Sequence, residues 1–241
     1  MVLSPIDFLN GLFSLIFVSV TVVIGLIIAS KYFKIKKRVF LLVGLGWAMI
    51  CSPWWPSSIS FLCVLFTGKG LEPVMYFFIG NVVMILALVL YLTGVTDMIY
   101  KQKQKIIIGI VVILGIIYNL YFYYNLMTDP NEIGVLEGYF DVTYVRFVSI
   151  YLFCYMITAV SFTILLARQS RKSDQPDIRL KGTLLIIAIT LYFIGAIFDA
   201  LIVLTEITLI ITRSILISSS ILFYLGFLMP EFLKKRVTKE A

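Results

Sequence analysis

Three ionisable side chains lie inside apolar stretches of this 241-residue chain: Arg146, Asp199 and Arg213. A charge inside an apolar segment is costly, so it is expected to face other protein groups and to pair with them. Asp199 lies seven residues before Glu206, which is near a short turn, and Arg213 lies seven residues after it. In an antiparallel helical hairpin the two side chains reach the same depth, about 10 Å below the turn. The spacing predicts an ion pair between Asp199 and Arg213.

The charges of the three intramembrane residues do not balance. Arg146 and Arg213 against Asp199 leave one surplus positive charge, and a guanidinium is suited to binding a carboxylate or phosphate. Glu206 would cancel the surplus if its side chain turned inward. Two interpretations of Arg146 therefore stay open: it extends to the membrane surface along its apolar stem, or it binds an anionic group of a ligand.

Other polar and aromatic residues are expected at the same depth. Asn81 and Asn119 fall in the outer halves of their segments, and Trp54 and Trp55 lie at an interruption formed by two prolines. The tryptophans could line a cavity or anchor the helix at the membrane interface. We predict a ligand pocket in the outer half of the bundle, formed by Trp54, Trp55, Asn81, Asn119, Arg146, Asp199 and Arg213.

Seven apolar stretches carry these residues. The mean hydropathy of +1.04 and the 61% of hydrophobic residues leave too little polar surface for a soluble domain. A stretch of about 20 residues suffices to cross a bilayer. The composition predicts an all-α membrane protein, a seven-transmembrane-helix bundle formed by residues 1–241 as one domain. The expected helices are roughly 8–30, 39–66, 74–96, 106–126, 142–166, 183–204 and 209–229.

Lys and Arg concentrate in every second gap between these stretches. They occupy 31–38, 101–105, 168–181 and the tail 234–239, whereas the other gaps and the amino terminus contain only Lys69. Because Lys and Arg stay on the cytoplasmic side, the amino terminus is predicted outside and the carboxyl terminus inside, in the plasma membrane. The inner charges, net +7 for the chain, are expected to contact anionic lipid headgroups and no nucleic acid. Asp97, at the inner end of the third stretch, is expected to pair with these Lys and Arg residues.

Pro53 and Pro56 interrupt the second stretch. Each proline removes a backbone donor and disturbs the preceding helical turn. The sequence predicts either a kink or a break there and does not decide between the two.

The gap 128–141 is acidic. It contains Asp129, Glu132, Glu137 and Asp141 and neither Lys nor Arg. This composition predicts a solvated outer loop that could act as a lid.

The chain has no histidine. This excludes Ser-His hydrolases, His-ligated zinc sites and His proton relays. The three cysteines, Cys51, Cys63 and Cys154, lie within apolar stretches, where thiols pack as small hydrophobic groups. We expect no catalytic residues, no metal, no cofactor and no enzymatic activity.

Several segments are similar to those of uncharacterised seven-helix membrane proteins of archaea. The resemblance covers nearly the whole chain but implies no activity or site residue. The architecture also resembles the seven-helix input modules that precede signalling domains in bacterial sensor kinases. The segments that carry the first resemblance are Gly46-Trp47, Pro53-Trp54-Trp55-Pro56, Ile59-Ser60-Phe61, Ile79-Gly80-Asn81, and residues 179–182, 195–200 and 227–231.

The function expected from these patterns is that of a receptor or sensor. A small molecule or a lipid would bind in the outer-half pocket, and the inner loops would contact a separate cytoplasmic output protein. The alternatives are a small-molecule or ion transporter or channel, and a non-catalytic membrane scaffold. A transporter needs a continuous polar path, whereas the inner halves of the stretches are nearly pure Ile, Leu, Val and Phe.

Overall fold

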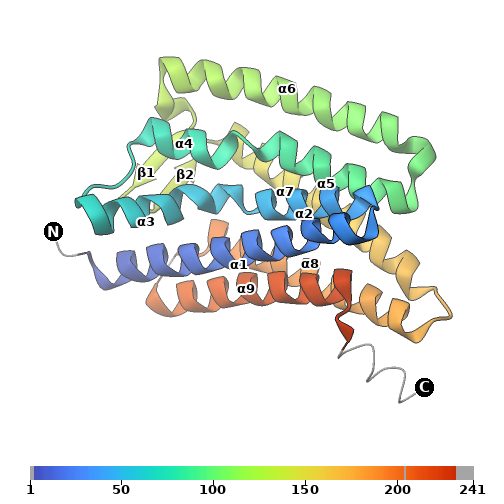
Figure 1. Ribbon diagram of the computed structural model, residues 1–241. Helices are drawn as coiled ribbons and strands as arrows, with labels where there is room; N and C mark the ends of the chain where they lie inside the picture. The colour runs from blue at the N-terminus through green and yellow to red at the C-terminus, as the bar shows by residue number, and fades with distance from the viewer. Residues whose placement is uncertain (1–2, 204, 232–241) are drawn as a thin grey trace.

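A computed structural model describes residues 3–203 and 205–231 of the chain (Figure 1). Seven helical spans in this part are long and apolar enough to cross a membrane. The predicted all-α seven-helix bundle is therefore confirmed, and the protein is a multi-pass membrane protein. The spans are Pro5–Ile35, Arg38–Thr67, Pro73–Ile99, Lys101–Thr128, Arg146–Arg171, Pro176–Leu201 and Glu206–Leu228.

Four of the spans are single α-helices and three contain shorter elements. The single helices are α1 (Pro5–Ile35), α7 (Arg146–Arg171), α8 (Pro176–Leu201) and α9 (Glu206–Leu228). The second span contains α2 (Arg38–Ile50), η1 (Ser52–Trp54) and α3 (Trp55–Thr67), the third contains α4 (Pro73–Asn81) and α5 (Met84–Ile99), and the fourth contains η2 (Lys101–Lys103) and α6 (Gln104–Thr128).

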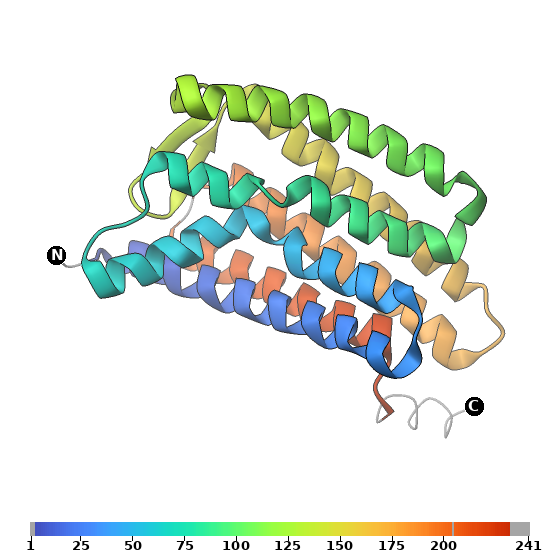
Figure 2. The same ribbon diagram turned by 45° about the horizontal axis from the view of Figure 1, so that its top comes forward.

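Six spans form a closed ring and the seventh packs outside it. Going around the ring, α1 contacts α2, α2 contacts α5, α5 contacts α7, α7 contacts α8, α8 contacts α9, and α9 returns to α1. Helix α6 lies along the outside of α5 (Figure 2). A face-to-face stack of Tyr118 on Tyr151, with ring centroids 3.6 Å apart, joins α6 to α7.

Small residues allow α1 and α2 to touch backbone to backbone. A Cβ added at Gly44 would lie 2.6 Å from the carbonyl oxygen of Gly25 and still closer to the backbone nitrogen of Ala29. Only glycine fits such an approach, as expected for helices that associate within a membrane. Gly109 differs, because a Cβ there would meet no atom within 4 Å.

The second span breaks at the two prolines. Helix α2 ends at Ile50, one 3₁₀ turn follows, and α3 begins at Trp55 with Pro56 in its first turn. Proline is tolerated at the first turn of a helix because the backbone donor it lacks is unused there. The structure therefore selects the break from the two predicted alternatives.

The third span also breaks, which the sequence analysis did not predict. Helix α4 ends at Asn81 and α5 begins at Met84. The Asn81 side chain donates to the Phe77 carbonyl oxygen (2.8 Å). Such a local bond competes with helical backbone pairing, which is why Asn weakens helix interiors.

The acidic gap contains a β-hairpin, which the sequence analysis did not predict. After η3 (Pro130–Glu132), strand β1 (Gly134–Glu137) pairs antiparallel with β2 (Asp141–Tyr144), with Gly134 opposite Tyr144. The Phe140 carbonyl oxygen accepts hydrogen bonds from Ser57 of α3 (3.0 Å) and Tyr76 of α4 (2.9 Å). These bonds fasten the turn of the hairpin onto the bundle. The four acids of the gap are exposed, as expected for a solvated segment, but part of the segment forms paired strands rather than a loop.

The basic gaps lie at the end of the bundle opposite the hairpin and the N-terminus (Figure 1). Asp97 of α5 is paired there with Arg38 of α2 (2.6 Å) and with Lys101 of η2, as the sequence analysis expected. The basic tail Lys234, Lys235, Arg236 and Lys239 lies outside the described residues. We call these two ends the basic end and the hairpin end.

Candidate functional site

A cavity of about 580 Å³ opens at the hairpin end of the bundle. Its size falls within the range of small-molecule sites, about 300 to 1,000 Å³. Its walls come from the break between α2 and α3, the hairpin, α7 and α8. Polar and charged lining residues are Ser57, Tyr76, Asp141, Thr143, Tyr144, Arg146, Ser149, Tyr155, Tyr192, Asp199 and Arg213, and Trp54 adds an indole N–H.

An ion pair between Arg213 and Asp199 lines the cavity. Arg213 Nη1 lies 3.0 Å from Asp199 Oδ2, and the arginine residue is only 3% exposed. The Trp54 indole N–H donates to the same carboxylate oxygen (2.6 Å), and Arg213 Nη2 donates to Asn10 Oδ1 of α1 (3.2 Å). This is the pairing predicted from the hairpin spacing, and it joins four separate segments of the chain.

The depth of Arg213 is set by the start of α9. Thr205 accepts a hydrogen bond from the Thr208 backbone N–H (3.3 Å), and the Thr208 hydroxyl accepts one from the Thr205 N–H (2.8 Å). Such a capping box satisfies two free donors at a helix start and fixes the first helical residue. Helix α9 therefore begins at Glu206, and Arg213 lies two turns below.

The break in the second span supplies groups that a continuous helix would not offer. Because α2 ends at Ile50, the carbonyl oxygen of that residue is free to accept a hydrogen bond from the Tyr192 hydroxyl (3.2 Å). The 3₁₀ turn then aims Trp54 at Asp199 and packs its ring edge-on against Phe17, at 5.2 Å. One wall of the cavity thus depends on the two prolines.

Buried polar atoms around the cavity have no partner among the described residues. The Tyr155 hydroxyl, Asp199 Oδ1 and Arg213 Nε are all buried and form no hydrogen bond. Leaving such a group unpaired costs about 1 to 3 kcal/mol or more. Three unpaired groups around one cavity are typical of a site that a ligand or ordered water completes.

Eight exposed residues form the opening of the cavity, which we call the cavity mouth: Asp141, Thr143, Arg146, Ser149, Ile150, Phe153, Ala200 and Leu201. Arg146 was predicted well inside the fifth stretch, but it is the first residue of α7 and is exposed. Strand β2 occupies the start of that stretch, so the helix begins only at Arg146. This residue therefore lies at the end of its span rather than inside it. No hydrogen bond or ion pair of Arg146 is found among the described residues.

The second carboxylate of the cavity comes from Asp141 rather than Glu206. Glu206 is exposed at the start of α9 and does not line the cavity. Asp141 is brought to the cavity mouth by strand β2, and its Oδ1 accepts the backbone N–H of Val142 (2.9 Å). The cavity therefore has two arginines and two aspartates, and no surplus positive charge.

Three residues of the predicted pocket lie elsewhere. Trp55 packs beside the core and donates to Cys51 Sγ (3.4 Å). Asn81 is buried between α4 and α6, where it accepts a hydrogen bond from Tyr118 (2.8 Å). Asn119 lies on α6, away from the cavity. The structure brings together Trp54, Arg146, Asp199 and Arg213 from the predicted set.

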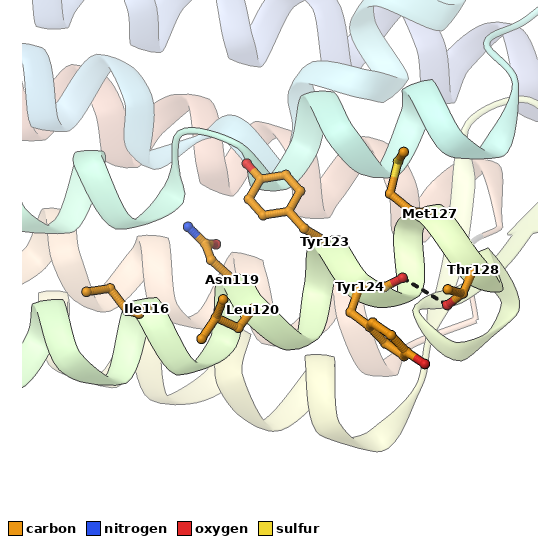
Figure 3. A pocket seen from close by; sticks show the side chains of 7 residues that line it. All are labelled: Ile116, Asn119, Leu120, Tyr123, Tyr124, Met127 and Thr128. Atoms are coloured by element: carbon orange, nitrogen blue, oxygen red, sulfur yellow. Dashed lines mark hydrogen bonds between the residues drawn. The ribbon is translucent and has the colours of Figure 1, made fainter.

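Asn119 lines a different hollow on the flank of α6 (Figure 3). All its lining residues belong to this one helix, and its one drawn hydrogen bond runs from Thr128 to the Tyr124 carbonyl oxygen (2.8 Å). No polar groups from other elements converge there. The residues are Ile116, Asn119, Leu120, Tyr123, Tyr124, Met127 and Thr128, a surface suited to lipid contact.

The sequence analysis missed Asp141, Tyr155 and Tyr192 as cavity residues. Tyr192 had a usable signal, because it lies seven residues before Asp199 and hence on the same helix face. Tyr155 and Asp141 had none, since their positions depend on how α7 and the hairpin pack against the rest of the bundle.

The pKa of the Asp141 carboxyl is raised above its ordinary value. The main cause is burial, because protein atoms around the cavity mouth remove part of its water. The Val142 N–H opposes this, the charges of Asp199 and Glu137 add to it, and the charge of Arg213 again opposes it. The folded protein therefore holds this proton more tightly than the unfolded chain does.

Replacing Asp141 by asparagine is expected to flatten part of the pH dependence of stability. With a raised folded-state pKa, the free energy of unfolding falls as pH rises from the unfolded value of about 3.9 through the folded one. Asp141→Asn removes this loss, so its melting temperature relative to wild type should improve as pH rises above about 4. Thermal unfolding in detergent micelles measures this. Glu132→Gln, at an exposed acid away from the cavity, is the control, and equal pH profiles for Asp141→Asn and wild type would contradict the expectation.

Comparisons with protein-family models, with curated proteins and with solved structures gave no match for this chain. The resemblance to archaeal seven-helix proteins stays a prediction. Function is accordingly inferred from the cavity.

Proposed function

We propose that this protein is a receptor-like or sensor-like membrane protein that binds a small molecule or a lipid in the cavity at its hairpin end. The observation that carries the proposal is the combination of a cavity of about 580 Å³ with buried polar atoms that lack partners. A scaffold protein would gain stability by filling this space and pairing these groups. A binding protein keeps them for its ligand.

The proposed orientation puts the hairpin end outside the cell. Its support is that the three described basic gaps share the opposite end, and Lys and Arg are retained in the cytoplasm. In the plasma membrane the cavity would then face external ligands or the outer leaflet. The basic end would contact anionic headgroups and a cytoplasmic output protein.

Binding fits the interior better than transport does. Beyond Tyr192 towards the basic end, Trp47 stacks on Phe223 at 3.6 Å between ring centroids and both are fully buried. The hydroxyls in this region pair within the protein, Thr21 with Ser220 (2.8 Å) and Tyr91 with Thr163 (2.7 Å). Apart from the Trp47 indole N–H, which has no hydrogen-bond partner among the described residues, the polar groups of these pairs are satisfied, and this supports binding rather than a through path.

The proposal predicts that a molecule remains bound to the protein after gentle purification. Native mass spectrometry of the full chain in maltoside micelles should detect a small-molecule or lipid adduct on the wild type. Ala196→Trp places a large ring in the cavity wall and should remove the adduct. Leu114→Trp, on the exposed face of α6, should leave it in place.

The adduct must be specific to the cavity for the proposal to stand. If no adduct is found on the wild type under any gentle extraction, or if Ala196→Trp retains it as Leu114→Trp does, binding in this cavity is wrong. Circular dichroism of both variants establishes that they are folded before they are compared.

A further inference from the structure

Two of the four charges around the cavity form an ion pair with each other, and the other two form none. Arg213 and Asp199 are joined at 3.0 Å. Arg146 and Asp141 line the same cavity and form no ion pair with each other within 4.0 Å or with any other described residue. One free cation and one free anion therefore stand at the cavity mouth.

Asp141 and Arg146 are five residues apart in the chain, on two consecutive elements of the fold. Asp141 is the first residue of strand β2, and Arg146 is the first residue of α7. The register of the hairpin and the bonds from Ser57 and Tyr76 to Phe140 hold the strand in place. The separation of the two charges is thus built into the fold.

The cavity behind this charged pair has unpartnered buried groups. Tyr155 is 6% exposed and Arg213 is 3% exposed, both line the cavity, and the Tyr155 hydroxyl and Arg213 Nε have no hydrogen-bond partner among the described residues. The charged mouth is therefore backed by a polar interior that is incomplete without an occupant.

We propose that the ligand is zwitterionic, with its cationic group facing Asp141 and its anionic group facing Arg146. This inference rests on the proposed function and names the ligand class of the same site. A singly charged ligand would match one of the two free groups and leave the other unpaired as water is displaced, which is costly. A zwitterion matches both.

The walls of the cavity favour an organic cation. Seven aromatic side chains line it: Trp54, Tyr76, Phe140, Tyr144, Phe153, Tyr155 and Tyr192. Aromatic faces attract ammonium groups, and quaternary ammonium ions are recognised by such surroundings. The raised pKa of Asp141 is consistent with this, because a carboxylate that has lost water gains from a nearby cation.

The apolar part of the ligand has a matching surface at the cavity mouth. Ile150 and Phe153 are 55% and 46% exposed on α7, one and two turns below Arg146. An acyl chain lying along them would enter from the bilayer, as with a choline phospholipid. The same headgroup chemistry could also come from a water-soluble zwitterion.

The test compares three single-chain amphiphiles of one chain length whose headgroups differ in charge. These are lysophosphatidylcholine (zwitterionic), lysophosphatidylglycerol (anionic) and an alkyltrimethylammonium (cationic), each titrated onto the full chain in maltoside micelles and measured by native mass spectrometry. The wild type is expected to bind the zwitterion about tenfold more tightly than either other probe, since one additional charge contact of about 1.4 kcal/mol is a factor of ten. Free phosphocholine is the fourth probe.

Substitutions at the mouth should change the preference in opposite directions. Asp141→Asn should shift selectivity towards the anionic probe and Arg146→Gln towards the cationic probe, each by about tenfold. Arg146→Lys keeps the charge and should keep the zwitterion preference, and Glu132→Gln should change nothing. Because selectivity is a ratio within one variant, a lower yield of folded protein does not mimic it.

Each outcome bears on the proposal. Saturable binding of phosphocholine alone at a similar affinity supports a zwitterion from the aqueous phase, and binding only with the chain attached supports one from the bilayer. A wild-type preference for a singly charged probe, or a zwitterion preference that neither Asp141→Asn nor Arg146→Gln alters, overturns the assignment. If none of the four probes binds while the purified wild type carries an adduct that Ala196→Trp removes, the zwitterion is wrong and cavity binding stands.

Discussion

Replacing Arg213 by alanine should lower the free energy of unfolding by about 3 to 5 kcal/mol, as expected when one partner of a buried ion pair is removed. Asp199 would keep its charge in a site where its side chain is only 15% exposed, with the Trp54 N–H as its remaining hydrogen-bond donor among the described residues. Asn10 Oδ1 would also lose the hydrogen bond that it accepts from the Arg213 guanidinium. Unfolding of the purified protein in micelles with denaturing detergent, followed by circular dichroism, measures the loss.

The matched control for Arg213→Ala is the same change at Arg146. Arg146 is exposed and has no partner among the described residues, so Arg146→Ala should change stability by no more than about 0.5 kcal/mol. The double variant Asp199→Asn with Arg213→Gln keeps hydrogen-bonding groups without the charges. It should be more stable than Arg213→Ala, which would demonstrate that the unpaired charge is the cause. Equal losses for the two arginine-to-alanine variants would contradict this account.

Gly44→Ala should be the second severely destabilising change, although it adds only one methyl group. The new Cβ would lie 2.6 Å from the Gly25 carbonyl oxygen and against the backbone of Ala29, so no side chain can move aside to relieve it. Helices α1 and α2 would have to separate. Overpacking of this kind costs about 1 to 3 kcal/mol and sometimes more.

Gly109→Ala is the control that separates packing from helix propensity. Position 109 is on α6 and has no neighbour within 4 Å of an added Cβ, so alanine there should be neutral or stabilising by up to about 1 kcal/mol. The same unfolding measurement serves for both variants. A Gly44→Ala protein as stable as Gly109→Ala would refute the backbone contact between α1 and α2.

The spans and the central ion pair could be predicted because each depends on local distance along the chain. Apolar runs of about 20 residues identify membrane helices without knowledge of their neighbours. Asp199 and Arg213 share a depth because a short turn lies midway between them. The residues on either side of one hairpin are related by helix geometry alone.

Residues on non-adjacent helices were predicted less well, because depth does not determine which way a helix face turns. Asn119 has the expected depth, but α6 lies outside the ring, so that side chain faces away from the cavity. Asn81 instead accepts a hydrogen bond from Tyr118 in the contact between α4 and α6. The order of helices around the ring results from packing between distant segments, which a single sequence does not reveal.

The hairpin was missed for a related reason. A short strand pair is marginal alone and forms here against the bundle, with Phe140 fixed by Ser57 and Tyr76. Acidic composition correctly indicated exposed side chains, but it did not indicate strand pairing. The consequence was large, because this segment brings Asp141 to the cavity and sets the position of Arg146.

The closed ring has a consequence for how the protein is made. Five spans separate α1 from α9 in the sequence, yet the two helices are neighbours and share the buried bond between Thr21 and Ser220. During translation α1 must therefore wait in the bilayer with this polar face uncovered until α9 emerges from the ribosome. The membrane insertion machinery, rather than the finished bundle, would shield that face in the interval.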